Sequence, residues 1–147
     1  MNPYAKMSYE DARAILKTGV YGVLATVDKD GRPYGVPLSY VTEDHHIYFH
    51  GAESGHKLRN FVHDPRATFT VVAEAAPEPA HYTMVYRSVI AFGEVRMVTE
   101  SKEKRKALQK LCQKYGAPAD PVQINAGLPH TAVFCLEVEY LSGKANG

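Results

Sequence analysis

The sequence contains few cysteines and has a net charge close to zero, and each of these features argues against a class of protein. Two cysteines occur in 147 residues, and neither belongs to a CxxC pair or another metal-ligand spacing. We therefore expect Cys112 and Cys135 to be small buried side chains rather than a disulfide, nucleophiles or metal ligands. The 17 basic and 16 acidic residues give a formal net charge of +1. This balance argues against nucleic-acid binding, which needs a concentrated basic surface.

Long apolar runs and catalytic signatures are missing as well. No stretch of about 18 or more apolar residues occurs, so we expect no membrane-spanning helix and no membrane partner. The polar opening MNPYAKMSYED lacks the apolar middle of a signal peptide, which favours a cytoplasmic location. No GxSxG motif occurs and neither cysteine stands beside a histidine in the sequence, so nucleophilic catalysis is not expected.

The hydrophobic pattern predicts one domain made mainly of β-strands. Ser8 and Gly19 bracket an amphipathic helix, and a second helix is predicted over SKEKRKALQKLCQKYG. Strands are predicted at 20–27, 33–42, 46–50, 67–73, 82–98 and 131–141. The regular alternation of strand and helix that a parallel sheet requires is absent. We therefore expect a small closed or split antiparallel barrel with inserted helices.

Prolines and a glycine mark the expected irregular segments. The stretch AEAAPEPAHYT, residues 73–83, is predicted to be a flexible loop. The stretch APADPVQINAGLPH, residues 117–130, has three prolines and is predicted to be a loop with one turn of helix. Gly93 lies inside the predicted strand 82–98, where it indicates a bend or a bulge.

The stretch YFHGAESGHKLRNFVHDPR, residues 48–66, has the features of a phosphate site. An apolar strand ends near Gly51, and Ser54 stands where it would cap a following helix. His56 and Lys57 would place basic side chains in the first helical turn, where the dipole disfavours cations unless an anion offsets them. The alternative is that both side chains simply face water.

The histidines do not form a metal-ligand pattern. His45 and His46 share a predicted turn, and His50 and His56 could approach one another. No third ligand joins either pair at helical or strand spacing, so no metal site is expected.

The run GVLATVDKDGRPYGVPLSYVTEDHHIYFHGAESGHKLRNFVHDPRATFTVV resembles the FMN-binding split barrels related to pyridoxamine 5′-phosphate oxidase. Within that superfamily the chain is most similar to the nitroimidazole-resistance (Nim) branch. YRSVIAFGEVRMV, KEKRKALQKLCQKY and EVEYLSGK fall where that branch has equivalents, so the resemblance covers nearly the whole chain. It implies one FMN-binding domain over residues 1–147, with six antiparallel strands. It also implies a homodimer with one FMN in each of two clefts between the subunits.

The resemblance further implies which residues hold FMN. They are Val36, Pro37, Leu38, Ser39, His50, Gly51, His56, Lys57 and Ser88. Residues 36–39 would line the isoalloxazine ring, while His50 and Gly51 border the ribityl and phosphate region. His56 and Lys57 would hold the phosphate, where the pyridoxamine oxidases have an arginine and a lysine. Ser88 would reach the flavin from the other subunit.

The implied activity is reduction of a small aromatic acceptor, of the nitroimidazole or nitroaromatic type, by NADH or NADPH. His50 is the expected catalytic residue, and its alternative is a histidine at a strand end with no catalytic role. The substrate side would include Tyr40, His50, residues 73–83, and Tyr82 or His130. Two other functions stay open: a flavin- or haem-binding module without fast turnover, and a pyridoxamine 5′-phosphate oxidase-like enzyme. The latter is disfavoured because no arginine and histidine set for the substrate phosphate is found near LSGKANG.

Overall fold

The structure, a computed structural model, describes residues 5–51 and 55–146. These residues form eight strands, four α-helices and two short 3-10 helices. The strands are β1 (Ala5–Lys6), β2 (Gly22–Val27), β3 (Pro33–Leu38), β4 (Val41–Glu43), β5 (His46–Gly51), β6 (Arg66–Glu78), β7 (Thr83–Met97) and β8 (Ala132–Asn146). The helices are α1 (Tyr9–Thr18), α2 (His56–His63), α3 (Ser101–Tyr115), α4 (Pro121–Gly127), η1 (Pro79–His81) and η2 (Leu128–His130).

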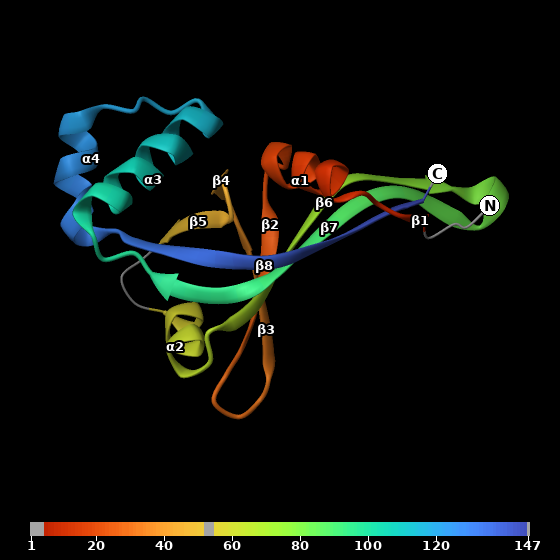
Figure 1. Cartoon of the computed structure of the whole chain (residues 1–147), viewed down its shortest axis with the longest axis horizontal. Coiled ribbons are helices and arrows are strands. Elements are labelled where there is room, and N and C mark those ends of the chain that lie inside the picture. The colour runs from red at the N-terminus through yellow and green to blue at the C-terminus, as the bar shows by residue number, and fades with distance from the viewer. Residues whose placement is uncertain (1–4, 52–54, 147) are drawn as a thin grey trace.

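The strands form one curled antiparallel sheet (Figure 1), which confirms the expected mainly-β class. Along the sheet the order is β3-β2-β6-β7-β8-β5-β4, and β1 pairs with β8. The expectation of six strands is wrong, because the path through the described residues holds seven. The predicted strand 33–42 divides into β3 and β4, which lie at opposite edges of the sheet. Ser39 and Tyr40 carry the chain from one edge to the other.

An apolar core fills the concave side of the sheet. Side chains alternate between its two faces, so that Leu24 is buried while its neighbour Val23 is exposed. At the centre, the Phe49 ring lies 4.9 Å from that of Phe69 and 5.2 Å from that of Phe134, measured between centroids. Burial of each such side chain contributes about 1.5–3 kcal/mol to the stability of the fold. These rings therefore help to hold the sheet in its curled shape.

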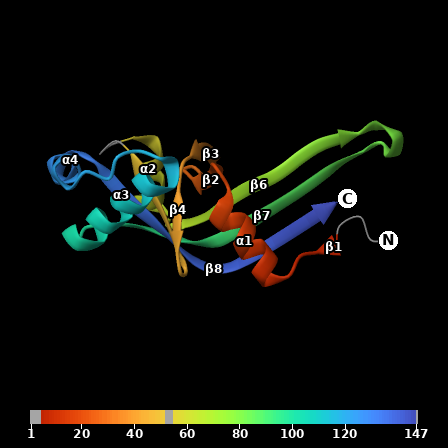
Figure 2. The same ribbon diagram turned by 90° about the horizontal axis from the view of Figure 1, so that it is seen from above.

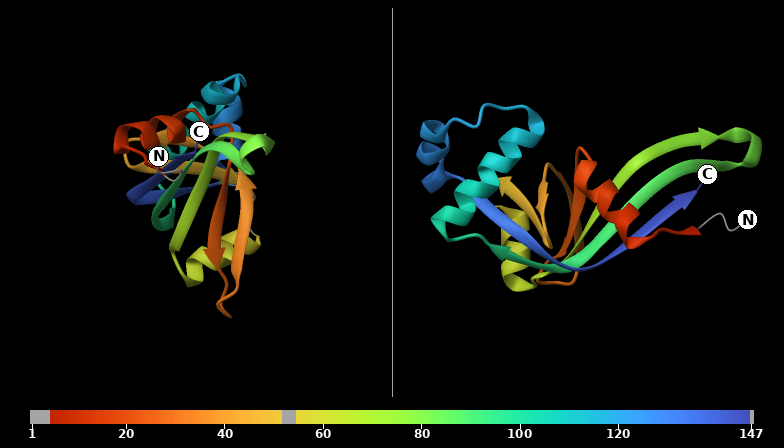
Figure 3. Two further views of the ribbon diagram at one scale, coloured as in Figure 1. Left: turned by 90° about the vertical axis from the view of Figure 1, so that its right-hand side faces the viewer. Right: turned by 45° about the horizontal axis from the view of Figure 1, so that its top comes forward.

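Two helices cover different parts of the sheet. α1 begins after Ser8, whose hydroxyl accepts the Asp11 amide as predicted, and it buries Ile15 and Leu16 in the core. α3 packs on β4, β5 and β8 over a separate apolar cluster that includes Cys135. Figure 3 shows α3 and α4 together at one end of the molecule, with the β6–β7 ribbon at the other.

Residues 72–88 form a projecting ribbon, which we call the arm (Figure 2). β2 pairs with β6 only over residues 68–70, whereas the β6–β7 pairing continues to the Glu78–Thr83 pair. The prediction of a flexible loop at 73–83 is therefore wrong for most of its length. Its Pro77 is tolerated because β6 is an edge strand there, paired with β7 on one side and with no strand of the described residues on the other.

Residues 117–130 are more helical than one turn. Asp120 accepts the amide of Val122 at 3.0 Å, and Pro121 occupies the first position of α4, where its missing N–H costs nothing. Pro121, one of the three prolines that indicated a loop, thus begins a helix.

A bulge occurs next to Gly93, but its extra residue lies on the partner strand: Phe92 pairs with Tyr140 and Gly93 with Val138, so Glu139 of β8 has no opposite residue on β7. The β7–β8 register shifts between Phe92 and Gly93, and a Cβ on Gly93 would lie 1.9 Å from the carbonyl oxygen of Glu137. A side chain at this position would collide with the backbone of β8. None of the helices in the described ranges is long and apolar enough to cross a membrane.

Candidate functional site

The end of β5 and the start of α2 bring two of the predicted phosphate-site residues together. A Cβ on Gly51 would lie 3.3 Å from Nζ of Lys57, so the lysine side chain rests against the bare backbone of Gly51. α2 begins at His56 after Gly55, and the predicted cap Ser54 lies outside the described residues. The strand end, the helix start and an ammonium group therefore share one corner of the fold.

His50 lies on the same strand end. Its backbone pairs with Val133 of β8, and its side chain is exposed. Desolvation by the surrounding protein lowers the pKa of His50, which favours the neutral imidazole at neutral pH. In that state one ring nitrogen donates a hydrogen bond and the other accepts one.

The four predicted ring-lining residues, three at the end of β3 and Ser39 directly after it, point in two directions. Val36 and Leu38 pack partly against the core, whereas Pro37 and Ser39 are exposed. Pro37 pairs with Val23 of β2, so the outer face here is a shallow, mostly apolar surface. A ligand on that face would meet the side chains of Pro37 and Ser39 and only the backbone of Val36 and Leu38.

Ser88 lies at the root of the arm, on a strand that does not pair with the strands carrying the other predicted residues. It pairs with Val72 of β6 and Lys144 of β8, and β7 has no pairing with β3 or β5. Its predicted contribution to a flavin bound mainly by another subunit stays a prediction.

Tyr40 is placed differently from the sequence expectation. Its side chain is fully buried, and its hydroxyl donates to the carbonyl of Leu16, so it cannot line the substrate side of a cleft. Of the other substrate-side candidates, Tyr82 is 98% exposed at the tip of the arm, and His130 is exposed in η2.

The sequence did not reveal a polar network beneath α3. Arg96 of β7 donates to both carboxylate oxygens of Glu103 on α3, at 3.0 and 2.7 Å, and Tyr48 of β5 donates to Glu103 at 2.7 Å. The Arg96 guanidinium lowers the pKa of Glu103 to about 2, so this carboxylate stays charged. Arg96 also binds Glu137 of β8, which in turn contacts His46. No motif links these residues because they come from four separate elements.

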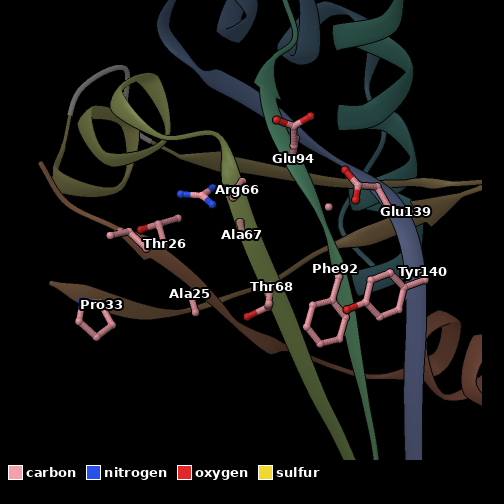
Figure 4. Close-up of a pocket in the computed structure, with 12 residues that line it drawn as sticks. Ala25, Thr26, Pro33, Arg66, Ala67, Thr68, Phe92, Glu94, Glu139 and Tyr140 are labelled. Atoms are coloured by element: carbon pink, nitrogen blue, oxygen red, sulfur yellow. The ribbon is translucent and has the colours of Figure 1, made fainter. Parts of the chain in front are cut away.

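The outer face of the sheet carries two hollows lined by apolar side chains, and the larger one is also lined by Arg66, Glu94 and Glu139. One, of about 770 Å³, has Ala25, Thr68, Phe92 and Tyr140 among its lining residues (Figure 4). The Phe92 and Tyr140 rings stack there with centroids 4.4 Å apart. A second hollow, of about 320 Å³, includes the exposed Val72.

The comparison with protein families decides the classification. The family model described as pyridoxamine 5′-phosphate oxidase matches residues 8–145. The chain belongs to this family.

Solved structures share the fold of this family member at low sequence identity. A candidate 5-nitroimidazole antibiotic resistance protein from Bacteroides thetaiotaomicron is 20% identical, with a TM-score of 0.83 over 96% of this chain and 86% of that one. A FAD-binding protein from Mesorhizobium loti is 21% identical, with a TM-score of 0.73 over 98% and 97% of the two chains. A FAD- and haem-binding protein from Mycobacterium smegmatis is 21% identical, with a TM-score of 0.78 over 99% and 74%. Among curated proteins, none matches this sequence.

Proposed function

We propose that this protein is an FMN-dependent reductase of small aromatic acceptors, and that two copies of the chain share each flavin site. Its family and the flavin-binding proteins of the same fold support a flavin. The observation that carries the proposal is the contact between the Lys57 ammonium and the bare backbone of Gly51. A phosphate placed there meets a positive charge without a side chain in the way.

The start of α2 fits the phosphate end of FMN. Its first turn contains no acidic residue, and no side chain of the described residues caps it. Among the described residues, no side chain competes with an anion for the first-turn amides, and the helix dipole adds partial positive charge at the same place. An anion satisfies these amides and offsets the repulsion between the dipole and Lys57.

The exposed face of β3 fits the ring end. Pro37 offers a flat apolar contact and Ser39 a hydroxyl that can donate to a ring heteroatom or accept from it. When bound, the flavin supplies the electron transfer from a reduced nicotinamide to the acceptor. The chain orients the ring, excludes water from one face and sets the polarity at its edge.

His50 is the chain's candidate for handling a proton near the ring. The lowered pKa favours the neutral imidazole, so it can donate from one nitrogen without bringing a charge into the cleft. We assign it to hydrogen bonding of the acceptor, at the strand end that leads to Lys57.

A second copy of the chain accounts for the uncovered sheet face and for Ser88. Tyr21, Val23 and Val72 expose apolar surface beside a hollow, and the arm extends past the body that one chain provides. Packing two copies on this face removes the apolar surface from water. The same packing would place the root of the arm, with Ser88, beside the cleft of the partner.

The phosphate assignment is tested with Lys57→Ala, using riboflavin as a matched ligand that lacks the phosphate. FMN affinity should fall about 10- to 100-fold, because a charge-assisted hydrogen bond contributes about 1.5–3 kcal/mol, while riboflavin affinity stays constant. Arg59→Ala, an exposed position on the same helix, is the control. Equal losses for both ligands, or undiminished FMN binding, would contradict the assignment.

Reductase activity and dimerisation have separate readouts. The bound flavin should be bleached by NADH or NADPH and reoxidised by a nitroaromatic compound, and a flavin that no nicotinamide reduces would exclude the reductase. Val72→Lys places a charge on the proposed interface and should yield monomers with weakened FMN binding, measured by sedimentation and fluorescence. A monomer with full FMN affinity would show that the site is not shared.

A haem- or flavin-binding module is the second candidate function. It is favoured by the fold shared with the FAD- and haem-binding protein from M. smegmatis. The absorption spectrum of the purified protein separates the candidates, because a haem band in place of a flavin spectrum excludes the reductase.

A further inference from the structure

Three side chains that can each supply a metal-ligand atom meet away from the corner formed by Gly51 and Lys57. The imidazole of His46, the thiol of Cys135 and the carboxylate of Glu137 each place one donor atom within 4.8 Å of the other two. The strand register makes this possible, because His46 of β5 lies directly opposite Glu137 of β8. Cys135, two positions before Glu137, shares its face of the sheet.

The two oxygens of Glu137 have separate partners. Oε2 lies 2.8 Å from Nε2 of His46, and Oε1 accepts a hydrogen bond from Nε of Arg96. Arg96 is itself paired with Glu103, which balances its charge. Carboxylates that bind metals commonly hold an outer partner in this way, with one oxygen anchored and the other aimed at the ion.

The cluster is open on one side. Cys135 is fully buried, whereas the side chains of His46 and Glu137 are 33% and 41% exposed. A hollow of about 540 Å³ adjoins it and is lined in part by His46, Tyr48 and Glu103. Solvent therefore reaches the His46 and Glu137 side of the cluster, where water can complete the coordination of an ion.

We propose that His46 Nε2, Cys135 Sγ and Glu137 Oε2 bind a thiophilic divalent cation of the zinc class. One imidazole, one thiolate and one carboxylate, with water in the fourth position, are a donor set that tetrahedral Zn²⁺ accepts. The thiol proton, and any proton between His46 and Glu137, pass to solvent as the ion binds. The thiolate and the carboxylate then neutralise the two charges of the ion.

The site is distinct from the proposed flavin site. His46 starts β5, whereas His50 and Gly51 end it, and α3 covers the region between β5 and β8 that holds Cys135. Bound metal would cross-link β5 to β8 beneath α3 and so stabilise this end of the sheet. Its binding requires neither Lys57 nor the flavin.

Cobalt is a suitable probe because Co²⁺ replaces Zn²⁺ and reports a thiolate ligand by a charge-transfer band in the near ultraviolet. Titration of metal-free, flavin-loaded protein with Co²⁺ should produce this band at one equivalent, as a difference spectrum, and Zn²⁺ should abolish it. Cys135→Ser should remove the band, and His46→Gln should weaken Co²⁺ binding more than about tenfold. The chain supplies matched controls in Cys112→Ser and His45→Gln, which should bind as the unaltered protein does.

Three results would overturn the proposal. The first is a folded protein that gives no thiolate–cobalt band. The second is a band that survives Cys135→Ser or disappears in Cys112→Ser. The third is unchanged affinity in His46→Gln, whose partly exposed position keeps the test valid if the buried Cys135 variant does not fold. Circular dichroism of each variant checks the fold.

Discussion

The ammonium of Lys114 lies 3.6 Å from the centroid of the Tyr40 ring and donates to the Tyr40 carbonyl oxygen at 2.9 Å. This contact ties the C-terminal end of α3 to the residue where the chain passes from β3 to β4. Because Tyr40 is buried and precedes β4, the end of α3 helps to fix the geometry of Ser39 on the proposed ring face.

Lys114 should make stability depend on pH. Burial lowers its pKa from 10.5 to about 8, so between these values the unfolded chain holds more protons at this group than the folded chain does. Stability therefore rises as the pH increases through this window, where the penalty for the buried charge disappears. Urea unfolding at a series of pH values should show this rise in the unaltered protein and not in Lys114→Met. The exposed Lys17→Met is the control, and a rise that persists in Lys114→Met would refute the assignment.

Tyr115→Phe should destabilise the same junction. The Tyr115 hydroxyl accepts the amide of Tyr40 at 3.0 Å and lies 2.6 Å from the carbonyl oxygen of Val20. Removing the hydroxyl leaves the Tyr40 amide without this hydrogen-bond partner in a part-buried place. The free energy of unfolding should fall by about 1–3 kcal/mol. Urea midpoints should show the loss, while Tyr82→Phe at the exposed arm tip should not. Equal stability of both variants would mean that water replaces the hydroxyl.

Gly93→Ala should be among the most damaging small substitutions. The added Cβ meets the Glu137 carbonyl oxygen, and the backbone of β8 must shift. Overpacking of this kind costs about 1–3 kcal/mol or more. Gly127→Ala, whose Cβ would find its nearest neighbour at 3.7 Å, is the matched control in thermal unfolding. If both variants unfold at the same temperature, the bulge does not require glycine.

The sequence predicts those features of the fold that are determined by residues close together in the chain. The bulge opposite Gly93 and the Ser8 cap were foreseeable, because a glycine inside a strand and a serine before an amphipathic run act on their own neighbourhood. The strand at 73–78 was not, because its partners lie across the hairpin in β7 and outweigh the local preference of Pro77.

The candidate site shows the same division. Gly51 and Lys57 are close in sequence, so their meeting at a strand end and a helix start could be predicted. The burial of Tyr40 could not, because it depends on contacts from α1 and α3. His46 and Cys135 meet only through the β5–β8 register, which no local pattern encodes.

Asn60 and Thr26 form an isolated buried polar pair. Their side chains are 3% and 1% exposed, and Nδ2 of Asn60 donates to Oγ1 of Thr26 at 3.1 Å. Asn60→Ala should cost about 1–3 kcal/mol, because the Thr26 hydroxyl loses its partner away from water. In a double-mutant cycle with Thr26→Val, the two losses should be non-additive by about 0.5–3 kcal/mol. Additive losses would show that the hydrogen bond does not couple α2 to β2.

The two cysteines should differ sharply in reactivity. Cys135 has no exposed surface, and burial raises the pKa of its thiol to about 12, so almost no thiolate forms near neutral pH. Cys112 lies on α3 with part of its surface exposed. A chromogenic disulfide reagent should therefore titrate one thiol quickly in the folded, metal-free protein and both thiols in denaturant. Cys112→Ser should abolish the fast phase, whereas a fast phase that remains in this variant would mean that β8 opens readily and that Cys135 is not sealed beneath α3.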